Sequence, residues 1–172
     1  MLTLSFYKDL GRLHLWLSPG TTMPVRYLFT TDRWINEYHG LPGATARRGL
    51  QANPSIQDWV RGFLNGYVVG DPLPRLIRGA GGGYAMDPPF KRLRFPHSAI
   101  VEMRTEHTRT FGFFASDRSF VADRIVLTDT LKTGRSANDT AYTAIAKSML
   151  DGWMRRLNPT ELDQTSDVNK VI

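Results

Sequence analysis

Side chains suited to acid–base and phosphate chemistry gather in one basic stretch of this 172-residue chain. Metal-free RNA cleavage needs a group that takes the ribose 2′-OH proton, cations that stabilise the charged phosphorus centre, and a proton donor for the leaving oxygen. Arg104 and Arg109 flank a short turn and suit one phosphate, and the imidazole group of His107 between them suits proton transfer. Glu102 is an alternative base, and Lys132 is a further source of charge or of a proton. We predict that these five residues form a catalytic site.

Further cations lie at the ends of three β-rich runs in the same stretch. Such runs can hold several cations around one concave face, which suits a phosphate-rich ligand better than an apolar one. The residues predicted to contact RNA are Lys91, Arg92, Arg94, Arg118 and Arg135.

A purely structural interpretation of these residues stays open. Alternation along a strand puts Glu102 and Arg104 on one face, where they can pair with each other. Ion pairs of Arg104 with Glu102 or Glu106 at the surface would contribute little to stability. His107, within a Thr-Glu-His-Thr turn, can equally be a solvated turn residue.

Composition restricts the possible classes of protein. A net charge of +6 and a pI near 9.9 attract polyanions at neutral pH. The chain has no cysteine, its four histidines lack HxxxH or HxH spacing, and it has no GxSxG motif, so we expect neither a metal, a cofactor nor a serine hydrolase. No apolar run is long enough to span a bilayer and the N-terminus lacks a secretory pattern, which favours a cytoplasmic protein without membrane association.

Hydrophobic periodicity predicts an α+β fold with an antiparallel sheet of about four strands and helices on one of its faces. The predicted strands are Val25–Thr30, Ala99–Arg104, Arg109–Ala115 and Phe120–Thr128. The links between the last three, TEHT and SDRS, are of hairpin length and predict an antiparallel meander. The Gly- and Pro-rich residues 70–90 are interpreted as a loop, and no lysine with Ser or Thr follows GAGGG to make it a phosphate-binding loop.

Three helices are predicted from apolar stripes and their caps. Their expected starts are Thr31-Asp32, Asn53-Pro54, and Ser136, Asn138 or Asp139. Their expected ends are Gly40, Gly66 and Asn158-Pro159. The aromatic residues of the second stripe, which includes Trp59 and Phe63, are assigned to core packing. The apolar stripe of the third helix, which runs from Tyr142 to Leu157, is assigned to core packing as well.

The chain is predicted to form a single domain over residues 23–157. Residues 1–22 are an N-terminal extension whose partial alternation suggests a hairpin, although a short helix is an open alternative. Their apolar side chains indicate that this extension packs on the domain. The polar tail, residues 158–172, is expected to be disordered.

From Pro24 onwards the predicted order is strand, two helices, three antiparallel strands and helix. That order, with VEMRTEHTRTFGFF followed by VLTDTLK, resembles the RelE/HigB superfamily of bacterial and phage toxins over about residues 24–150. The resemblance implies a RelE-like fold, ribosome-dependent mRNA cleavage and a cognate antitoxin.

The chain departs from this family pattern in two places. Glu102 stands where RelE-type enzymes carry lysine. An acid at this position is more like the HigB-like or phage-derived branch. No tyrosine stands near Lys132 in the sequence. A non-catalytic member of the same fold that binds RNA or a protein partner is therefore the alternative.

Overall fold

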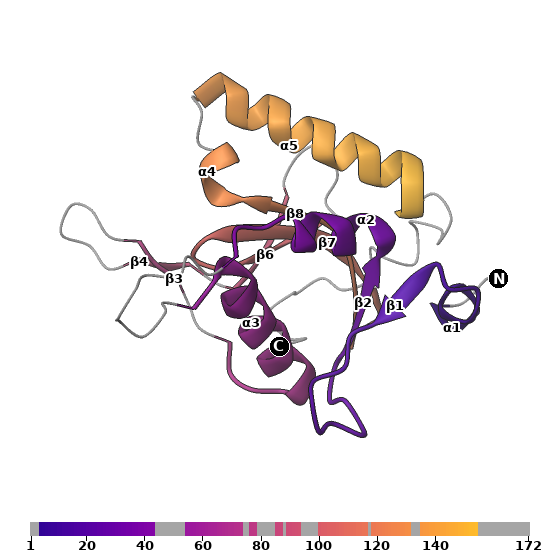
Figure 1. Ribbon diagram of the computed structural model, residues 1–172. Helices are drawn as coiled ribbons and strands as arrows, with labels where there is room; N and C mark the ends of the chain where they lie inside the picture. Colours follow the sequence, from indigo (N-terminus) through magenta and orange to yellow (C-terminus); the bar gives the residue numbers. More distant parts are fainter. Residues whose placement is uncertain are drawn as a thin grey trace.

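A computed structural model describes residues 4–43, 54–73, 76–78, 85–87, 89–93, 100–116, 118–131 and 135–154. The described residues form an α+β protein built on a six-stranded mixed sheet (Figure 1). The strands of this sheet are β1 (Leu13–Leu15), β2 (Tyr27–Thr31), β5 (Phe90–Arg92), β6 (Val101–Arg104), β7 (Thr108–Ser116) and β8 (Ser119–Leu127). A separate antiparallel pair is formed by β3 (Leu76–Arg78) and β4 (Ala85–Asp87). The helices are α1 (Leu4–Asp9), α2 (Asp32–His39), α3 (Ile56–Val69), α4 (Thr128–Leu131), α5 (Arg135–Met149) and the π-helical turn η1 (Leu150–Met154).

The predicted four-stranded antiparallel sheet is wrong. The strand order is β1-β2-β8-β7-β6-β5, and β2 runs parallel to β8. The two helices α2 and α3 and the chain that follows them separate β2 from the meander, so β8 can return beside β2 in the same direction. Residues 70–90, interpreted as a loop, contain β3 and β4 and end at Phe90, the first residue of β5. β5 pairs with β6, and Phe90 is buried in the core.

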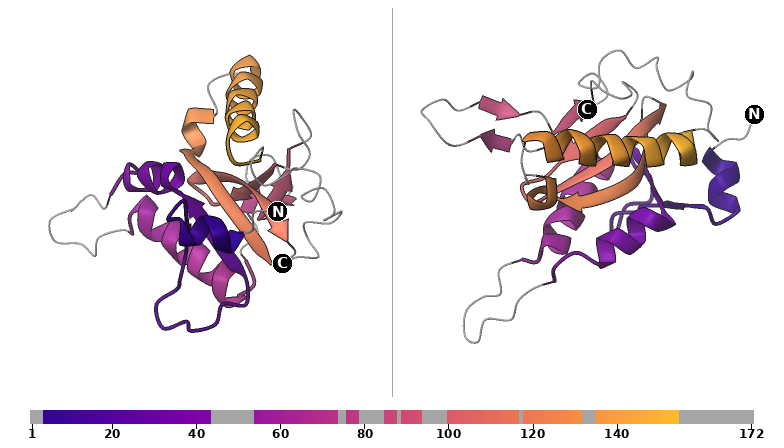
Figure 2. Two further views of the ribbon diagram at one scale, coloured as in Figure 1. Left: turned by 90° about the vertical axis from the view of Figure 1, so that its right-hand side faces the viewer. Right: turned by 90° about the horizontal axis from the view of Figure 1, so that it is seen from above.

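The prediction that the helices cover one face of the sheet is also wrong. In Figure 2, α4 and α5 lie on one side of the sheet, while α2 and α3 lie on the other. Both faces are apolar because neighbouring positions of β7 are both hydrophobic. Phe113 packs in the cluster that contains residues of α5, whereas Phe114 packs in the cluster that contains Val60 and Leu64 of α3.

The antiparallel meander of β6, β7 and β8 is confirmed. Its register places Arg104 opposite Arg109 and Glu102 opposite Phe111. A bulge follows in the next pair, where Phe111 lies opposite Arg124 and Gly112 opposite Ala122, so that Asp123 is the extra residue. A Cβ atom on Gly112 would lie 2.2 Å from the carbonyl oxygen of Val121; only glycine fits this close approach.

The boundaries of α2 were predicted correctly. The Thr31 hydroxyl accepts a hydrogen bond from the backbone N–H of Trp34 at 3.2 Å, and Gly40 follows the last residue of the helix. Thr31 therefore caps the helix, as its position in the sequence indicates.

The predicted boundaries of α3 were wrong at both ends. Ser55 caps the helix in a capping box with Asp58, and Asn53 lies outside the described residues. The helix passes Gly66 because Tyr67 continues the buried stripe, and it ends at Gly70 with a φ of 87°. Trp59, assigned to the core, is half exposed on this helix.

The third predicted helix also differs from expectation. α5 begins at Arg135, ahead of all three proposed caps, and its regular turns end at Met149. Gly152 in η1 has a φ of −96° and a ψ of −110°, which interrupts the helix. Leu157 and Asn158-Pro159 lie outside the described residues, as do residues 158–172.

The N-terminal extension forms a helix and a strand rather than a hairpin of its own. β1 pairs antiparallel with β2, and Leu13 in β1 is fully buried. Trp16 packs edge-on against Trp34 of α2, with ring centroids 5.8 Å apart. The extension thus packs on the sheet, as its apolar residues indicate. In the described part of the chain, no helix is both long enough and apolar enough to cross a membrane.

Candidate functional site

Three of the five predicted catalytic residues meet under α5. The Glu102 Oε1 atom lies 3.1 Å from Nε of Arg109, and its Oε2 atom lies 3.3 Å from Nε of Arg104. Alternation along β6 and the pairing of Arg104 with Arg109 put all three on the same face of the sheet. The structure therefore assembles one carboxylate between two guanidinium groups.

Tyr142 of α5 completes this cluster. Its hydroxyl donates a hydrogen bond of 2.9 Å to Oε1 of Glu102, and its ring packs edge-on against Phe111. Burial, together with the negative charge of Glu102, raises the pKa of Tyr142 to about 12. The prediction from the sequence placed Tyr142 only in the apolar stripe of its helix. A tyrosine in such a stripe usually needs a hydrogen-bond partner, which is the signal that could have found it.

The Glu102 cluster, meaning Glu102, Arg104, Arg109 and Tyr142, is largely closed to solvent. Glu102 is 2% exposed and Arg104 is 6% exposed. Arg109 lies nearer the surface, and its Nη1 atom donates to the carbonyl oxygens of Thr105 and Thr108 at 2.5 Å and 2.9 Å. Because three donors surround its carboxylate, Glu102 is better suited to orienting the arginines than to accepting a proton from a substrate.

The turn between β6 and β7 brings His107 to the rim of this cluster. The His107 ring is partly exposed and lies 4.0 Å from the exposed carboxylate of Glu106. Its backbone carbonyl accepts a hydrogen bond from Thr128 at 2.8 Å, which fixes the turn against the start of α4. Lys132 lies outside the described residues.

The described residues predicted to bind RNA lie on different elements. Lys91 is exposed on β5, directly opposite Glu102 in the strand register. Arg118 is exposed in the β7–β8 turn, at the other end of β7 from His107. Arg92 and Arg135 belong to β5 and α5, and Arg94 lies outside the described residues. Lys91 thus lies beside the Glu102 cluster, whereas Arg118 does not.

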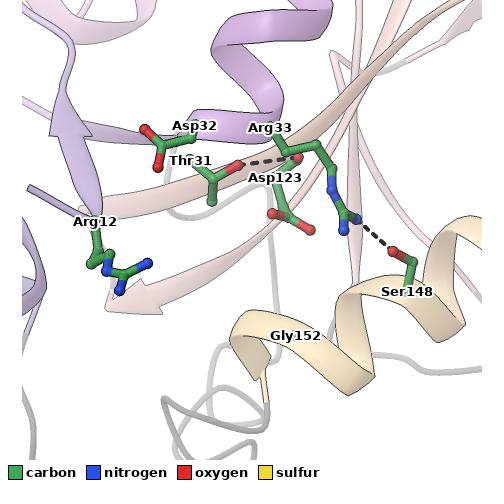
Figure 3. A pocket seen from close by; sticks show the side chains of 7 residues that line it. All are labelled: Arg12, Thr31, Asp32, Arg33, Asp123, Ser148 and Gly152. Carbon is green, nitrogen blue, oxygen red and sulfur yellow. Dashed lines mark hydrogen bonds between the residues drawn. The ribbon is translucent and has the colours of Figure 1, made fainter.

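A second polar site was not predicted from the sequence. A cavity of about 220 Å³ opens where β2, α2 and β8 meet the end of α5 (Figure 3). The residues that line it are Arg12, Thr31, Asp32, Arg33, Asp123, Ser148 and Gly152. They come from segments far apart in the chain, so no local motif marks the site. The one local signal is an aspartate inside the apolar run FVADRIVL of β8.

Asp123 is the deepest acid of this cavity. It is 3% exposed, because the bulge in β8 turns it inward, and its carboxyl group points into the cavity (Figure 3). Burial raises the pKa of Asp123 above its usual value, although a hydrogen bond from Thr31 and the charges of Arg33 and Arg124 partly oppose this shift.

The other charged groups around the cavity have partners elsewhere. Arg33 donates to the Ser148 hydroxyl at 2.5 Å, and Arg124 donates to Glu37 at 2.5 Å. The carboxylate of Asp32 lies 2.6 Å from Nε2 of His14. Over the described ranges, no group of three or more acidic or histidine side chains is arranged to hold a metal ion.

Comparison with known proteins identifies no relative: no family model, curated protein or solved structure matches the chain. The resemblance to the RelE/HigB superfamily therefore stays a prediction. What the protein does has to be argued from the chemistry of its own residues.

Proposed function

We propose that the protein is a toxin-like, metal-free endoribonuclease that acts on mRNA during translation at the ribosome and is neutralised by an antitoxin protein. One observation carries this proposal. Glu102, Arg104 and Arg109, chosen from the sequence for RNA cleavage, converge on one point beside the turn that holds His107.

The geometry suggests a division of roles among these residues. Glu102, whose carboxylate accepts a hydrogen bond from Tyr142, pairs with Nε of Arg109 and so fixes this arginine in place. A fixed guanidinium group stabilises the charge that develops on phosphorus better than a free one does. We assign proton transfer to His107, because its ring is partly exposed and can reach a substrate. Lys91 adds an exposed positive charge beside them.

A second candidate function is non-catalytic binding of RNA or of a protein partner by the same fold. The observation that favours it is the burial of Glu102 and Arg104. A carboxylate enclosed by two arginines and a tyrosine is a common way to stabilise a buried charge. In that case the cluster is part of the core, and the exposed cations alone attract RNA.

Induced expression separates the two functions. The wild-type protein should arrest growth, co-expression of a neighbouring antitoxin gene should rescue it, and primer extension on a translated message should show new 5′ ends. His107→Gln should lower cleavage by about a hundredfold or more, because it removes the proton-transfer group from a partly exposed position. Arg109→Ala should lower it by a similar factor. Arg61→Ala, on the exposed side of α3, is the charge-matched control and should cleave like wild type.

Arg109 also holds the turn, so its variant needs a thermal melt to show that the fold survives. If wild-type protein is well expressed without any antitoxin and leaves both cell growth and the message intact, the protein is not a ribonuclease. An RNA affinity that persists in that case and weakens steeply with salt would support the second candidate.

A further inference from the structure

The cavity at the end of α5 contains an acid that the packing of the sheet does not explain. A buried carboxylate is normally paired with a cation, because losing water costs several kcal/mol. Among the described residues, Asp123 has no cation within the 4.0 Å of an ion pair. The nearest arginines, Arg33 and Arg124, bind Ser148 and Glu37 instead. Its carboxyl group therefore keeps hydrogen-bonding capacity toward the cavity.

Two arginines lie at the rim of the cavity. Arg12 and Arg33 are both exposed, and their guanidinium groups lie on either side of Asp123 in Figure 3. Asp32, the other acid of the rim, is held by His14. A ligand entering the cavity thus meets two guanidinium groups first and the Asp123 carboxyl group at the floor.

The size of the cavity limits the ligand. Pockets for drug-sized molecules hold about 300–1,000 Å³, and this one holds about 220 Å³. Arginine pairs favour phosphate because their N–H groups match its oxygen atoms. A carboxyl group on a cavity floor accepts hydrogen bonds from hydroxyl groups.

We propose that this cavity binds a ribose phosphate, with the phosphate between Arg12 and Arg33 and a sugar hydroxyl on Asp123. The site goes beyond the proposed function and differs from the Glu102 cluster. Ser148 and Tyr142, which mark the two sites on α5, are six residues apart, or about 9 Å along a helix. The ribose phosphate can be a free sugar phosphate or the 5′-phosphorylated end of an RNA.

Isothermal titration calorimetry on the full chain tests this proposal without any cleavage assay. Ribose 5-phosphate should bind saturably with one site per chain, and more tightly than inorganic phosphate. Arg12→Gln and Arg33→Gln should each weaken binding about tenfold or more, since each removes a charge-assisted hydrogen bond. Arg61→Gln, which removes an arginine from α3, should bind like wild type. A short RNA is then tested as a competitor of ribose 5-phosphate, once with a 5′-phosphate and once with a 5′-hydroxyl group. If only the 5′-phosphorylated RNA competes, the natural ligand is an RNA end. If neither RNA competes, the natural ligand is a free sugar phosphate.

The role of Asp123 has its own readout. Asp123→Ala should remove the preference for ribose 5-phosphate over inorganic phosphate while both still bind. Asp123→Asn keeps the shape and the hydrogen-bonding ability of the side chain and should retain part of that preference. It is the control for the case in which Asp123→Ala does not fold. Absence of saturable binding, or equal affinities in the Arg12, Arg33 and Arg61 variants, would overturn the site. Equal wild-type affinities for the two ligands would overturn the assignment of the sugar. Because no cleavage is measured, these outcomes are independent of whether the protein is a ribonuclease.

Discussion

Two acidic side chains are buried in the same sheet, and their surroundings differ. Glu102 on β6 is enclosed by two arginines and a tyrosine, each within hydrogen-bonding or ion-pair distance. Asp123 on β8 is equally buried, but among the described residues no cation lies within ion-pair distance of it. Thr31 donates to its backbone carbonyl oxygen at 3.3 Å, and its carboxyl group faces a cavity. Burial alone therefore does not distinguish a structural acid from one available to a ligand. The two kinds of acid are distinguished by the partners that surround their carboxyl groups.

The comparison also qualifies what the sequence suggested. Glu102, which was chosen for catalysis, is the acid with more charged and hydrogen-bonding partners. Asp123, the acid with fewer, was not among the predicted residues. Ion pairs and hydrogen bonds around a buried carboxylate fix the positions of neighbouring groups, so Glu102, held by Tyr142, is suited to holding Arg109 in place. Asp123 is suited to direct contact with a ligand.

The largest effect is expected for Glu102→Ala. Removing this carboxylate leaves the buried Arg104 and the partly buried Arg109 without their common partner, which should lower the free energy of unfolding by about 3–5 kcal/mol. Urea denaturation measures the change. Glu106→Ala, on the exposed part of the same turn, is the control and should change stability by less than about 0.5 kcal/mol. A loss below about 1 kcal/mol for Glu102→Ala would mean that the cluster is not structural.

A smaller loss is expected for Gly112→Ala, which alters the bulge that turns Asp123 inward. The new methyl group would meet the Val121 carbonyl oxygen and the Phe120 ring, and such overpacking costs about 1–3 kcal/mol. Gly62→Ala is the matched control, because its methyl group would meet nothing within 4 Å on α3 and should stabilise the helix by up to about 1 kcal/mol. Thermal or urea unfolding of both variants checks the prediction, which fails if the two behave alike.

Tyr142→Phe should cost about 1.5 kcal/mol, since it removes one hydrogen bond to a charged group and little volume. The pKa of Tyr142, raised to about 12, also predicts a pH effect. The neutral phenol is favoured in the folded state, so its stabilising contribution is complete below the ordinary pKa near 10 and is lost as the pH rises through 12. Ultraviolet titration of the tyrosinate band in wild type and variant tests this. Tyr27→Phe, at an exposed position, is the control. The prediction fails if the absorbance change that is lost in Tyr142→Phe occurs over the same pH range as the change that is lost in Tyr27→Phe.

The smallest change, of opposite sign, is expected for Asp123→Asn. Burial raises the pKa of Asp123, so the charged form destabilises the fold. Its contribution is therefore most favourable below the ordinary aspartate pKa, about 3.9, and is lost as the pH rises through the raised value. At neutral pH the variant should be as stable as wild type or more stable by up to about 1 kcal/mol, and this difference should shrink in acid. Urea unfolding at several pH values tests it; a loss as large as that of Glu102→Ala would erase the contrast between the two acids.

The parts of this fold that could be predicted are those fixed by local chemistry. The four-residue TEHT link forces β6 and β7 into a hairpin, and Thr31 caps α2 with its own side chain. The parallel pairing of Tyr27 with Ser119 could not be predicted, because no local pattern relates residues that far apart in the chain. The stop at Gly66 was wrong because burial of Tyr67 and Val68 outweighs the helix-breaking tendency of one glycine.

The same distinction holds for the two sites. The meeting of Glu102, Arg104 and Arg109 follows from strand alternation across one hairpin. The contribution of Tyr142 depends on how α5 lies across the sheet. The cavity needs Arg12, Asp123 and Ser148 together, and nothing local in the sequence relates them.

The strand order also bears on how the protein avoids self-association. Within the described part of the chain, the main sheet ends in β1 and β5, which are only three residues long, while its nine-residue strands β7 and β8 lie inside. Short edge strands offer few backbone groups for another chain to pair with, and an outward lysine such as Lys91 on β5 further opposes stacking of sheets edge to edge. The two longest strands of the described sheet are thereby kept away from intermolecular β-sheet extension, the first step of many aggregation processes.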